Sequence, residues 1–326
     1  MRAVDEGNIE RVRLLAPVQS KIQTKDWETI HGCGSKKCTA LMRAAVFNKV
    51  EAVKILVKYE KGMTDVYGKT ALMSAAKKGN VEAVKILLNH ERRMQNKEGE
   101  TALTLAACFG HTEVVKLLLN HEKRIQDNTG WTALMWAADN IHIETNKFFT
   151  PHKRENGHTE IGKLLLPHEK GMTDRSGTTA LMMATQRGSV AMVRLLRDYE
   201  KGVRRIDGKT ALIMAAEKGY AEIVELLVSH EKGIQRNDGW TALMITAQNG
   251  HIGIVRILLE YDKGMQRDTG RTALMEAAQN DHTGVVALLL PYEKGLQEKD
   301  GWTALMLAAL HGHAETVKCL LPRRGE

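Results

Sequence analysis

The tripeptide Thr-Ala-Leu returns along this chain at an almost constant interval, and no other feature restricts the possible folds as much. Its nine copies begin at Thr39, Thr70, Thr101, Thr132, Thr179, Thr210, Thr241, Thr272 and Thr303. Seven of the eight intervals are 31 residues long and one is 47. A fixed period of this length is typical of stacked units that are too small to bury their apolar side without neighbours. The sequence therefore predicts a linear array rather than a round core.

Each repeat contains the signals for two helices. The threonine can cap the amides of a short first helix, which continues as Ala-Leu-Met-x-Ala-Ala. A glycine such as Gly79 or Gly110 then ends this helix, because a left-handed backbone costs glycine least. A second helix follows, with an apolar stripe that includes Val114 and Leu118. The predicted fold class is all-α, with about ten helix-turn-helix units joined by short finger turns.

The repeated motifs resemble those of ankyrin repeats. The matching elements are Thr-Ala-Leu-Met, the Ala-Ala pair, the Val-Val-Lys-Leu-Leu-Leu run and the Gly-His pairs at Gly110-His111, Gly157-His158, Gly250-His251 and Gly312-His313. Ala and Met replace the usual Pro and His, and the period is 31 where the family norm is 33. This dialect is similar to the ankyrin-only proteins of diplomonad protozoa, some of which associate with cytoskeletal structures or carry an upstream kinase domain. No kinase motif occurs in this chain.

The resemblance covers essentially all 326 residues, which predicts one solenoid over residues 1–326. A truncated leading repeat takes up residues 1–25, and an inserted first finger lies at about 26–37. Regular repeats run from residue 38 onward, with an insertion at 141–156 between the two helices of one unit. A solenoid tolerates extra residues in its loops, so we expect both insertions to protrude. Phe148 and Phe149 in the second insertion are candidate contact residues.

Charge and composition favour a protein of the cytoplasm. The 47 Lys and Arg against 39 Asp and Glu give a net charge of +8, which favours partners with acidic surfaces or tails. Eight acidic residues, from Glu60 to Glu293, each precede a basic residue, and we interpret these pairs as a solvated face that makes nucleic-acid binding unlikely. Charges interrupt every apolar run, which argues against a signal sequence or a membrane span. The four cysteines are interpreted as free thiols.

Catalytic and metal-binding patterns are absent from the sequence. It contains no nucleophile elbow, strand-flanked glycine-rich loop or His-Glu-x-x-His motif, so we predict that the chain is no enzyme and needs no cofactor. His31, Cys33 and Cys38 could ligate zinc, but their spacing fits no common site and a fourth ligand is missing. No metal site is therefore predicted. The histidines of the turns and helix ends are interpreted as scaffold.

Binding residues are expected where the repeats differ from one another. By resemblance to the family, positions in the fingers and at the ends of the first helices line a concave groove. The candidates are Phe47, Lys69, Lys78, Phe109, Trp131, Arg187, Lys209, Trp240, Arg271, Trp302 and Leu310. Trp131 with Phe109, and Trp302 with Leu310, are candidate aromatic anchors. Packing of these tryptophans on the next finger is an equal alternative, and Trp136 is interpreted as mostly core.

These observations predict a non-catalytic scaffold that binds other proteins through the groove. Two alternatives follow from the resemblance and the basic charge: a structural component of a cytoskeletal, microtubule-associated assembly, and a regulatory subunit of an enzyme carried on another chain. The last unit ends in Leu320 and Leu321 with little polar capping, which would also allow end-to-end assembly.

Overall fold

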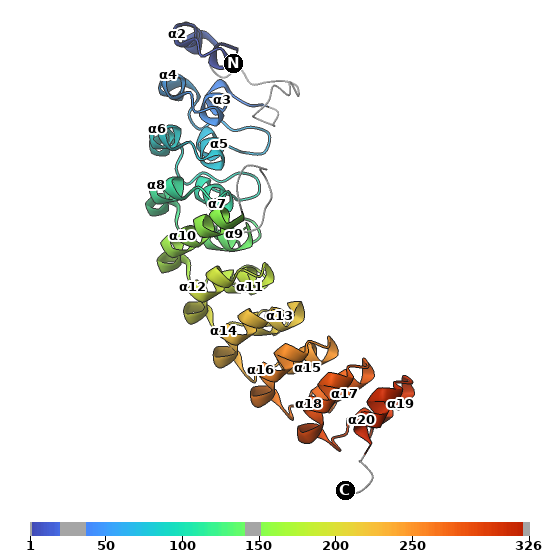
Figure 1. Cartoon of the computed structure of the whole chain (residues 1–326). Coiled ribbons are helices and arrows are strands. Elements are labelled where there is room, and N and C mark those ends of the chain that lie inside the picture. Colours follow the sequence, from blue (N-terminus) through green and yellow to red (C-terminus); the bar gives the residue numbers. More distant parts are fainter. Residues whose placement is uncertain (1, 20–36, 141–150, 322–326) are drawn as a thin grey trace. The chain divides into compact units, whose positions relative to one another are not determined.

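A computed structural model describes residues 2–19, 37–140 and 151–321, without the side chains of residues 151–157. Over these ranges the chain forms twenty helices and no strand (Figure 1). The predicted all-α class is therefore confirmed. Contacts gather the helices into two compact units, Met1–Arg175 and Ser176–Glu326, which we call unit 1 and unit 2.

Unit 1 consists of a short leading helix pair followed by four complete pairs. Its helices are α1 (Arg2–Asp5), α2 (Ile9–Gln19), α3 (Ala40–Val46), α4 (Val50–Glu60), α5 (Ala71–Lys78), α6 (Val81–Glu91), α7 (Ala102–Cys108), α8 (Thr112–Glu122), α9 (Ala133–Asp139) and α10 (Pro151–Glu169). The first helices of the four pairs, α3, α5, α7 and α9, pack in one row, and the second helices pack in a parallel row (Figure 1). The leading helix has only four residues.

Unit 2 repeats this arrangement in five helix pairs. Its helices are α11 (Ala180–Gln186), α12 (Val190–Glu200), α13 (Ala211–Lys218), α14 (Ala221–Glu231), α15 (Ala242–Gln248), α16 (Ile252–Asp262), α17 (Ala273–Gln279), α18 (Thr283–Glu293), α19 (Ala304–Leu310) and α20 (Ala314–Leu320). Each first helix contacts its own second helix and the first helix of the next repeat. The stacking of small repeats that the period predicts is thus present within unit 1 and within unit 2.

The predicted capping residues set the limits of the first helices. In α5 the hydroxyl of Thr70 accepts a hydrogen bond from the Met73 amide at 3.3 Å, which satisfies one of the free donors of the first turn. Gly79 ends the same helix with φ at 74°, a left-handed conformation. Thr210 and Gly219 limit α13 in the same way. The cap and stop signals in the sequence therefore act as predicted.

The core lies between the two rows of helices. Leu72, Met73 and the small Ala75 and Ala76 of α5 are almost completely buried. Small side chains at these positions let the first helices of successive repeats pack closely, while the apolar stripe of each second helix covers them. Because every interior repeat presents the same buried frame, the side chains outside that frame are free to differ.

Helix α10 begins earlier than predicted for the second helix of its repeat. It begins at Pro151, so residues 151–156, which the sequence analysis assigned to the insertion, belong to the second helix. Proline favours the first position of a helix because its missing amide would have no partner there. Phe148 and Phe149, and most of the inserted first finger, lie outside the described residues.

No helix in the part of the chain that the structure describes is long and apolar enough to cross a membrane.

Candidate protein-binding face

The fingers are the segments between the second helix of one repeat and the capping threonine of the next. Neighbouring fingers are joined by backbone hydrogen bonds: the Lys97 amide donates to the Tyr67 carbonyl at 2.9 Å, and the Asn128 amide to the Glu98 carbonyl at 2.9 Å. In unit 2 the Asn237 amide donates to the Asp207 carbonyl at 3.2 Å. We call the surface formed by the fingers and the C-terminal ends of the first helices the finger face.

Acidic or amide side chains hold the fingers of unit 1 from within. One carboxylate oxygen of Asp65 accepts hydrogen bonds from the Tyr67 amide at 2.9 Å and the Lys69 amide at 2.8 Å. Asn96 and Asp127 make the same pair of bonds in the next two fingers. These are Asx turns, in which the side chain supplies a partner for amides that would otherwise be free.

Arginines occupy the same position in three of the four fingers of unit 2, and Glu298 occupies it in the last. Arg236 pairs with Glu217 at 3.5 Å and with Asp238 at 2.9 Å. Arg267 lies 3.6 Å from Glu276 and places its guanidinium 4.5 Å from the centre of the Trp240 ring. The backbone of the turn keeps its own hydrogen bond, from the Arg236 amide to the Trp240 carbonyl. The finger face of unit 2 is therefore built from ion pairs and a cation–π contact.

The predicted groove residues of unit 1 lie on its finger face, whereas the insertion residues Phe148 and Phe149 lie outside the described residues. Phe47 follows α3 and is 42% exposed, with the Arg43 guanidinium 5.6 Å from its ring centre. Phe109 follows α7 and lies 5.1 Å from the Lys77 ammonium. Lys69 is half-buried in the finger before α5, and Lys78 is exposed at the end of that helix.

The predicted residues of unit 2 lie on the corresponding surface. Arg187 and Leu310 are exposed at the ends of α11 and α19, and Trp302 is 37% exposed in the last finger. Lys209, Trp240 and Arg271 are half-buried and engaged with neighbours on the same face. The predicted set is therefore placed at accessible positions in both units, although its role in binding stays a prediction.

The two tryptophans of the fourth repeat pack on each other. The rings of Trp131 and Trp136 are 4.8 Å apart, and the Trp136 ring nitrogen donates to Asp127 at 2.9 Å. Trp136 is half-buried rather than mostly core, because its indole reaches the finger carboxylate at the edge of the face. Phe109 and Trp131 thus belong to one surface that includes Trp136, a residue the sequence analysis set aside.

The interpretation of the acid–base dipeptides as a solvated face is wrong for the acids. All eight acidic side chains are buried at 1–2% exposure: Glu60, Glu91, Glu122, Glu169, Glu200, Glu231, Asp262 and Glu293. Their basic neighbours, such as Arg92 and Lys123, are exposed. We call these eight residues the acid ladder.

Each acid of the ladder accepts a hydrogen bond from an amide in the first turn of the first helix of its own repeat. At least six of the eight also accept one from a turn of the repeat before: Glu91, Glu122, Glu169, Glu231, Asp262 and Glu293. One oxygen of Glu91 accepts from the Leu72 amide at 2.7 Å, and the other accepts from the Gly62 amide at 3.0 Å. The same two bonds recur at Glu122 with Leu103 and Arg93. Burial raises the pKa of the Glu91 carboxyl, while these amide hydrogen bonds favour its charged form and oppose the increase. The ladder therefore couples neighbouring repeats and belongs to the scaffold.

The turn histidines are part of the scaffold, as predicted. The ring nitrogens of His111 and His158 hydrogen-bond to the carbonyls of Lys77 and Cys108 in the preceding repeats, at 3.0 and 3.2 Å. His313 binds the Gln279 carbonyl in the same way at 2.9 Å. Burial lowers the pKa of the His111 ring. These contacts explain why histidine recurs at this turn without any need for a ligand.

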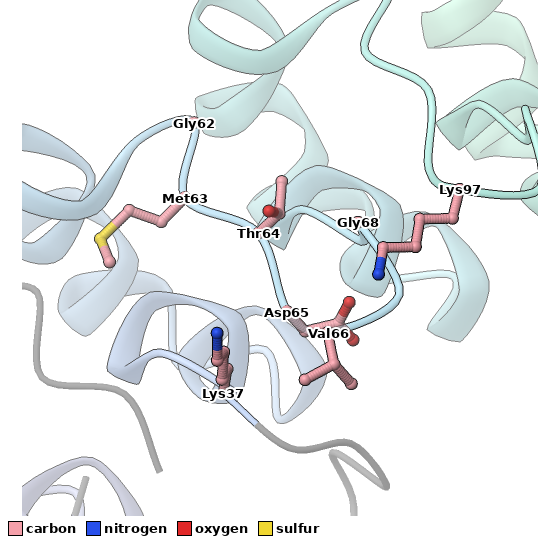
Figure 2. Close-up of a pocket in the computed structure, with 8 residues that line it drawn as sticks. All are labelled: Lys37, Gly62, Met63, Thr64, Asp65, Val66, Gly68 and Lys97. Carbon is pink, nitrogen blue, oxygen red and sulfur yellow. The ribbon is translucent and has the colours of Figure 1, made fainter. Parts of the chain in front are cut away.

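A pocket of about 510 Å³ opens beside the finger between α4 and α5. Figure 2 shows the finger residues Gly62 to Gly68 with Lys37 on one side and Lys97 on the other. Its carboxylate, Asp65, is already engaged by two amides of its own turn. The pocket is a hollow of the finger face without an acid–base or nucleophile pair among its lining residues.

Among the described residues, no group of three or more His, Cys, Asp or Glu side chains could hold a metal ion. Of the three residues considered for zinc, His31 and Cys33 lie outside the described ranges. Cys38 is buried, and its thiol donates to the Thr39 carbonyl at 3.6 Å.

Stacked helix pairs with joined fingers define a repeat protein of the kind that offers an extended binding surface. A family model for ankyrin repeats matches residues 1–97, 88–155, 152–238, 198–266, 228–297 and 260–326, so the chain belongs to the ankyrin-repeat family. Ankyrin repeats generally mediate interactions between proteins and are typically non-catalytic. A search of curated proteins finds no match. The similarity to diplomonad proteins therefore stays a prediction.

Proposed function

We propose that this chain is a non-catalytic scaffold that holds partner proteins against the finger faces of its two units. One observation supports this most directly: the buried frame is nearly constant, while the accessible residues of the finger face change from repeat to repeat. The position before the capping threonine is buried Cys38 in one repeat, half-buried Lys69 and Trp131 in others, and exposed Trp302 in the last. Folding of the repeats does not require such variation on the surface, whereas recognition of particular partners does.

Partners with acidic surfaces belong to the same proposal, since the chain has a net charge of +8. The cytoskeletal role, regulation of an enzyme on another chain and end-to-end assembly stay predictions.

The test is affinity purification from the native cell with wild type and a triple variant, Trp131→Ala, Trp240→Ala and Trp302→Ala. Aromatic anchors contribute about 2 kcal/mol or more each to binding, so we expect the triple variant to lose its partners. A matched control replaces three exposed tyrosines on the second helices, Tyr199→Ala, Tyr261→Ala and Tyr292→Ala, and should retain them. Circular dichroism establishes that both variants fold. Unchanged partner recovery by the folded tryptophan variant would remove the finger face as the binding surface.

A further inference from the structure

Two positions of each repeat approach each other on the finger face. They are the residue before the capping threonine and the residue seven positions after that threonine, which we call the flanking pair. In unit 2 the flanking pair Lys209 and Glu217 forms an ion pair of 2.8 Å. Arg271 and Gln279, the flanking pair of a later repeat, are hydrogen-bonded. The backbone therefore brings these two side chains within bonding distance of each other.

In the repeat that contains α5, both members of the flanking pair are lysines, Lys69 and Lys77. None of the other eight repeats has two residues of like charge at these positions. Lys78 adds a third cation next to them. Within the described ranges, neither Lys69, Lys77 nor Lys78 forms an ion pair with a carboxylate, whereas Lys209 has Glu217 at the equivalent place.

The surroundings of these cations are aromatic rings and the carboxylate of Glu100, which attracts Lys77 but forms no ion pair with it among the described residues. The Lys77 ammonium lies 5.1 Å from the Phe109 ring centre and the Lys69 ammonium 5.9 Å from that of Tyr67. Burial and the charges of Lys69 and Lys78 lower the pKa of Lys77. Glu100 attracts Lys77 from the next repeat, but its carboxylate accepts a hydrogen bond from Asn96 at 2.6 Å. A positive site with adjacent aromatic surface therefore stays open to a partner.

We propose that Lys69, Lys77 and Lys78 bind carboxylate side chains of an acidic segment of a partner protein. An incoming carboxylate would pair with Lys69 as the Glu217 carboxylate pairs with Lys209, and Lys77 would be a second donor to it. The Phe109 ring offers apolar contact beside Lys77. Charge complementarity selects this occupant, because a carboxylate relieves the repulsion between the lysines and accepts hydrogen bonds from them. The inference rests on the proposed function, since it names the partner chemistry for one part of the finger face.

The chain itself supplies a matched pair of test variants. Lys77→Glu converts the α5 flanking pair into the arrangement seen at Lys209 and Glu217, and is therefore expected to fold. Glu217→Lys performs the opposite change in unit 2 and leaves Lys209 and Arg236 without that carboxylate. Lys69→Glu is a second variant, which reverses the order of charges in the α5 pair.

The probe is a fluorescein-labelled peptide of ten glutamates, with binding to the full chain followed by fluorescence anisotropy. We expect Lys77→Glu and Lys69→Glu each to weaken binding about tenfold, since hydrogen bonds to charged groups contribute that much or more. We expect Glu217→Lys to strengthen binding, and added salt to weaken it for wild type. Thermal denaturation confirms that each variant is folded.

Equal affinity of wild type and the folded Lys77→Glu and Lys69→Glu variants would overturn the proposal. So would tighter binding of a single-stranded DNA decamer that depends on the same lysines, because the site would then serve nucleic acid. The proposed function is tested separately by the tryptophan variant. Loss of partners by that variant, together with no effect of the lysine variants on the glutamate peptide, would reject only this inference.

Discussion

The fingers of the two units reach the same backbone turn by different chemistry. In unit 1, Asp65, Asn96 and Asp127 hold the turn from inside with hydrogen bonds to its amides. In three of the four fingers of unit 2 an arginine occupies that position, and its guanidinium group lies beside acids of the fingers and first helices: Arg205, Arg236 and Arg267. The last finger has Glu298 there. The backbone hydrogen bond of the turn forms with either kind of residue at this position. The side chain there can therefore either accept hydrogen bonds from the turn amides or form ion pairs on the finger face. Three fingers of unit 2 thus have a basic side chain at the position where three fingers of unit 1 have an acceptor for the turn amides.

The largest effect is expected when a unit 1 finger receives the unit 2 residue. Asp127 accepts hydrogen bonds from the Thr129 and Trp131 amides and the Trp136 ring nitrogen, all within 2.8–2.9 Å, and is 7% exposed. Asp127→Arg leaves these donors unpaired, and we expect a loss of about 3 kcal/mol or more in the free energy of unfolding. Urea denaturation measures the loss, and hydrogen exchange should place it in the finger and α9.

The reverse exchange, Arg236→Asp, serves as the control. It removes the pairs with Glu217 and Asp238 but restores an acceptor for the turn amides, so we expect a change of less than about 1 kcal/mol. Equal costs in both directions would contradict the difference between the two kinds of finger.

A smaller effect is expected at Glu276, which is buried in α17 beside Arg267 and Arg271. The corresponding residues of two earlier repeats in unit 2 are Met183 and Met214. Removing one partner of a buried ion pair leaves the other charges without compensation, so we expect Glu276→Met to lose about 2 kcal/mol at pH 7. The loss is limited because Arg271 keeps Gln279 and Glu298 as neighbours. Glu260→Met, on the exposed surface of α16, should change little.

The loss of stability in Glu276→Met should depend on pH. Burial raises the pKa of this carboxyl above its ordinary value of 4.5. A carboxyl with a higher pKa in the folded state contributes most to stability below about pH 4.5, and this contribution is lost as the pH rises through the folded-state pKa. The cost of Glu276→Met relative to wild type should therefore grow from pH 7 to pH 4 in urea denaturation. A cost that shrinks toward low pH would contradict a raised pKa.

The smallest effect concerns the acid ladder, which both units share. Unit 1 has only glutamates at the ladder positions, whereas unit 2 contains Asp262. The shorter side chain lies 3.4 Å from the Leu243 amide, compared with 2.7 Å between Glu231 and the Leu212 amide. We expect Asp262→Glu to stabilise unit 2 by about 0.5–1 kcal/mol and Glu231→Asp to destabilise it by a similar amount. A shift of both urea midpoints in the same direction would show that side-chain length is not the cause.

The frame could be predicted from the sequence because its signals are local. Thr70 and Gly79 act within a few residues of their own positions, and the 31-residue period repeats them often enough to define every unit. Pro151 is also a local signal, because proline favours the first turn of a helix, but it lies inside the segment predicted to be an insertion.

The burial of the acid ladder was not predicted, because the basic residue after each acid indicated an exposed pair. Helical spacing contained the opposite signal: Val53, Val57 and Glu60 follow one another at the four- and three-residue steps of a single buried stripe. What could not be predicted is the residue that each acid binds. Gly62 lies 29 residues before Glu91, and only stacking of the two repeats brings them together.

This long-range bond has a consequence for the order of events during synthesis. The turn amide at Gly62 cannot form its hydrogen bond until Glu91, 29 residues later in the chain, has left the ribosome. The same delay recurs at Gly202 with Glu231 and at Gly233 with Asp262. In a nascent chain, these turns can complete their hydrogen bonds only after the next repeat has been synthesised. The bonds therefore form in order from the amino terminus, about one repeat behind the newest segment.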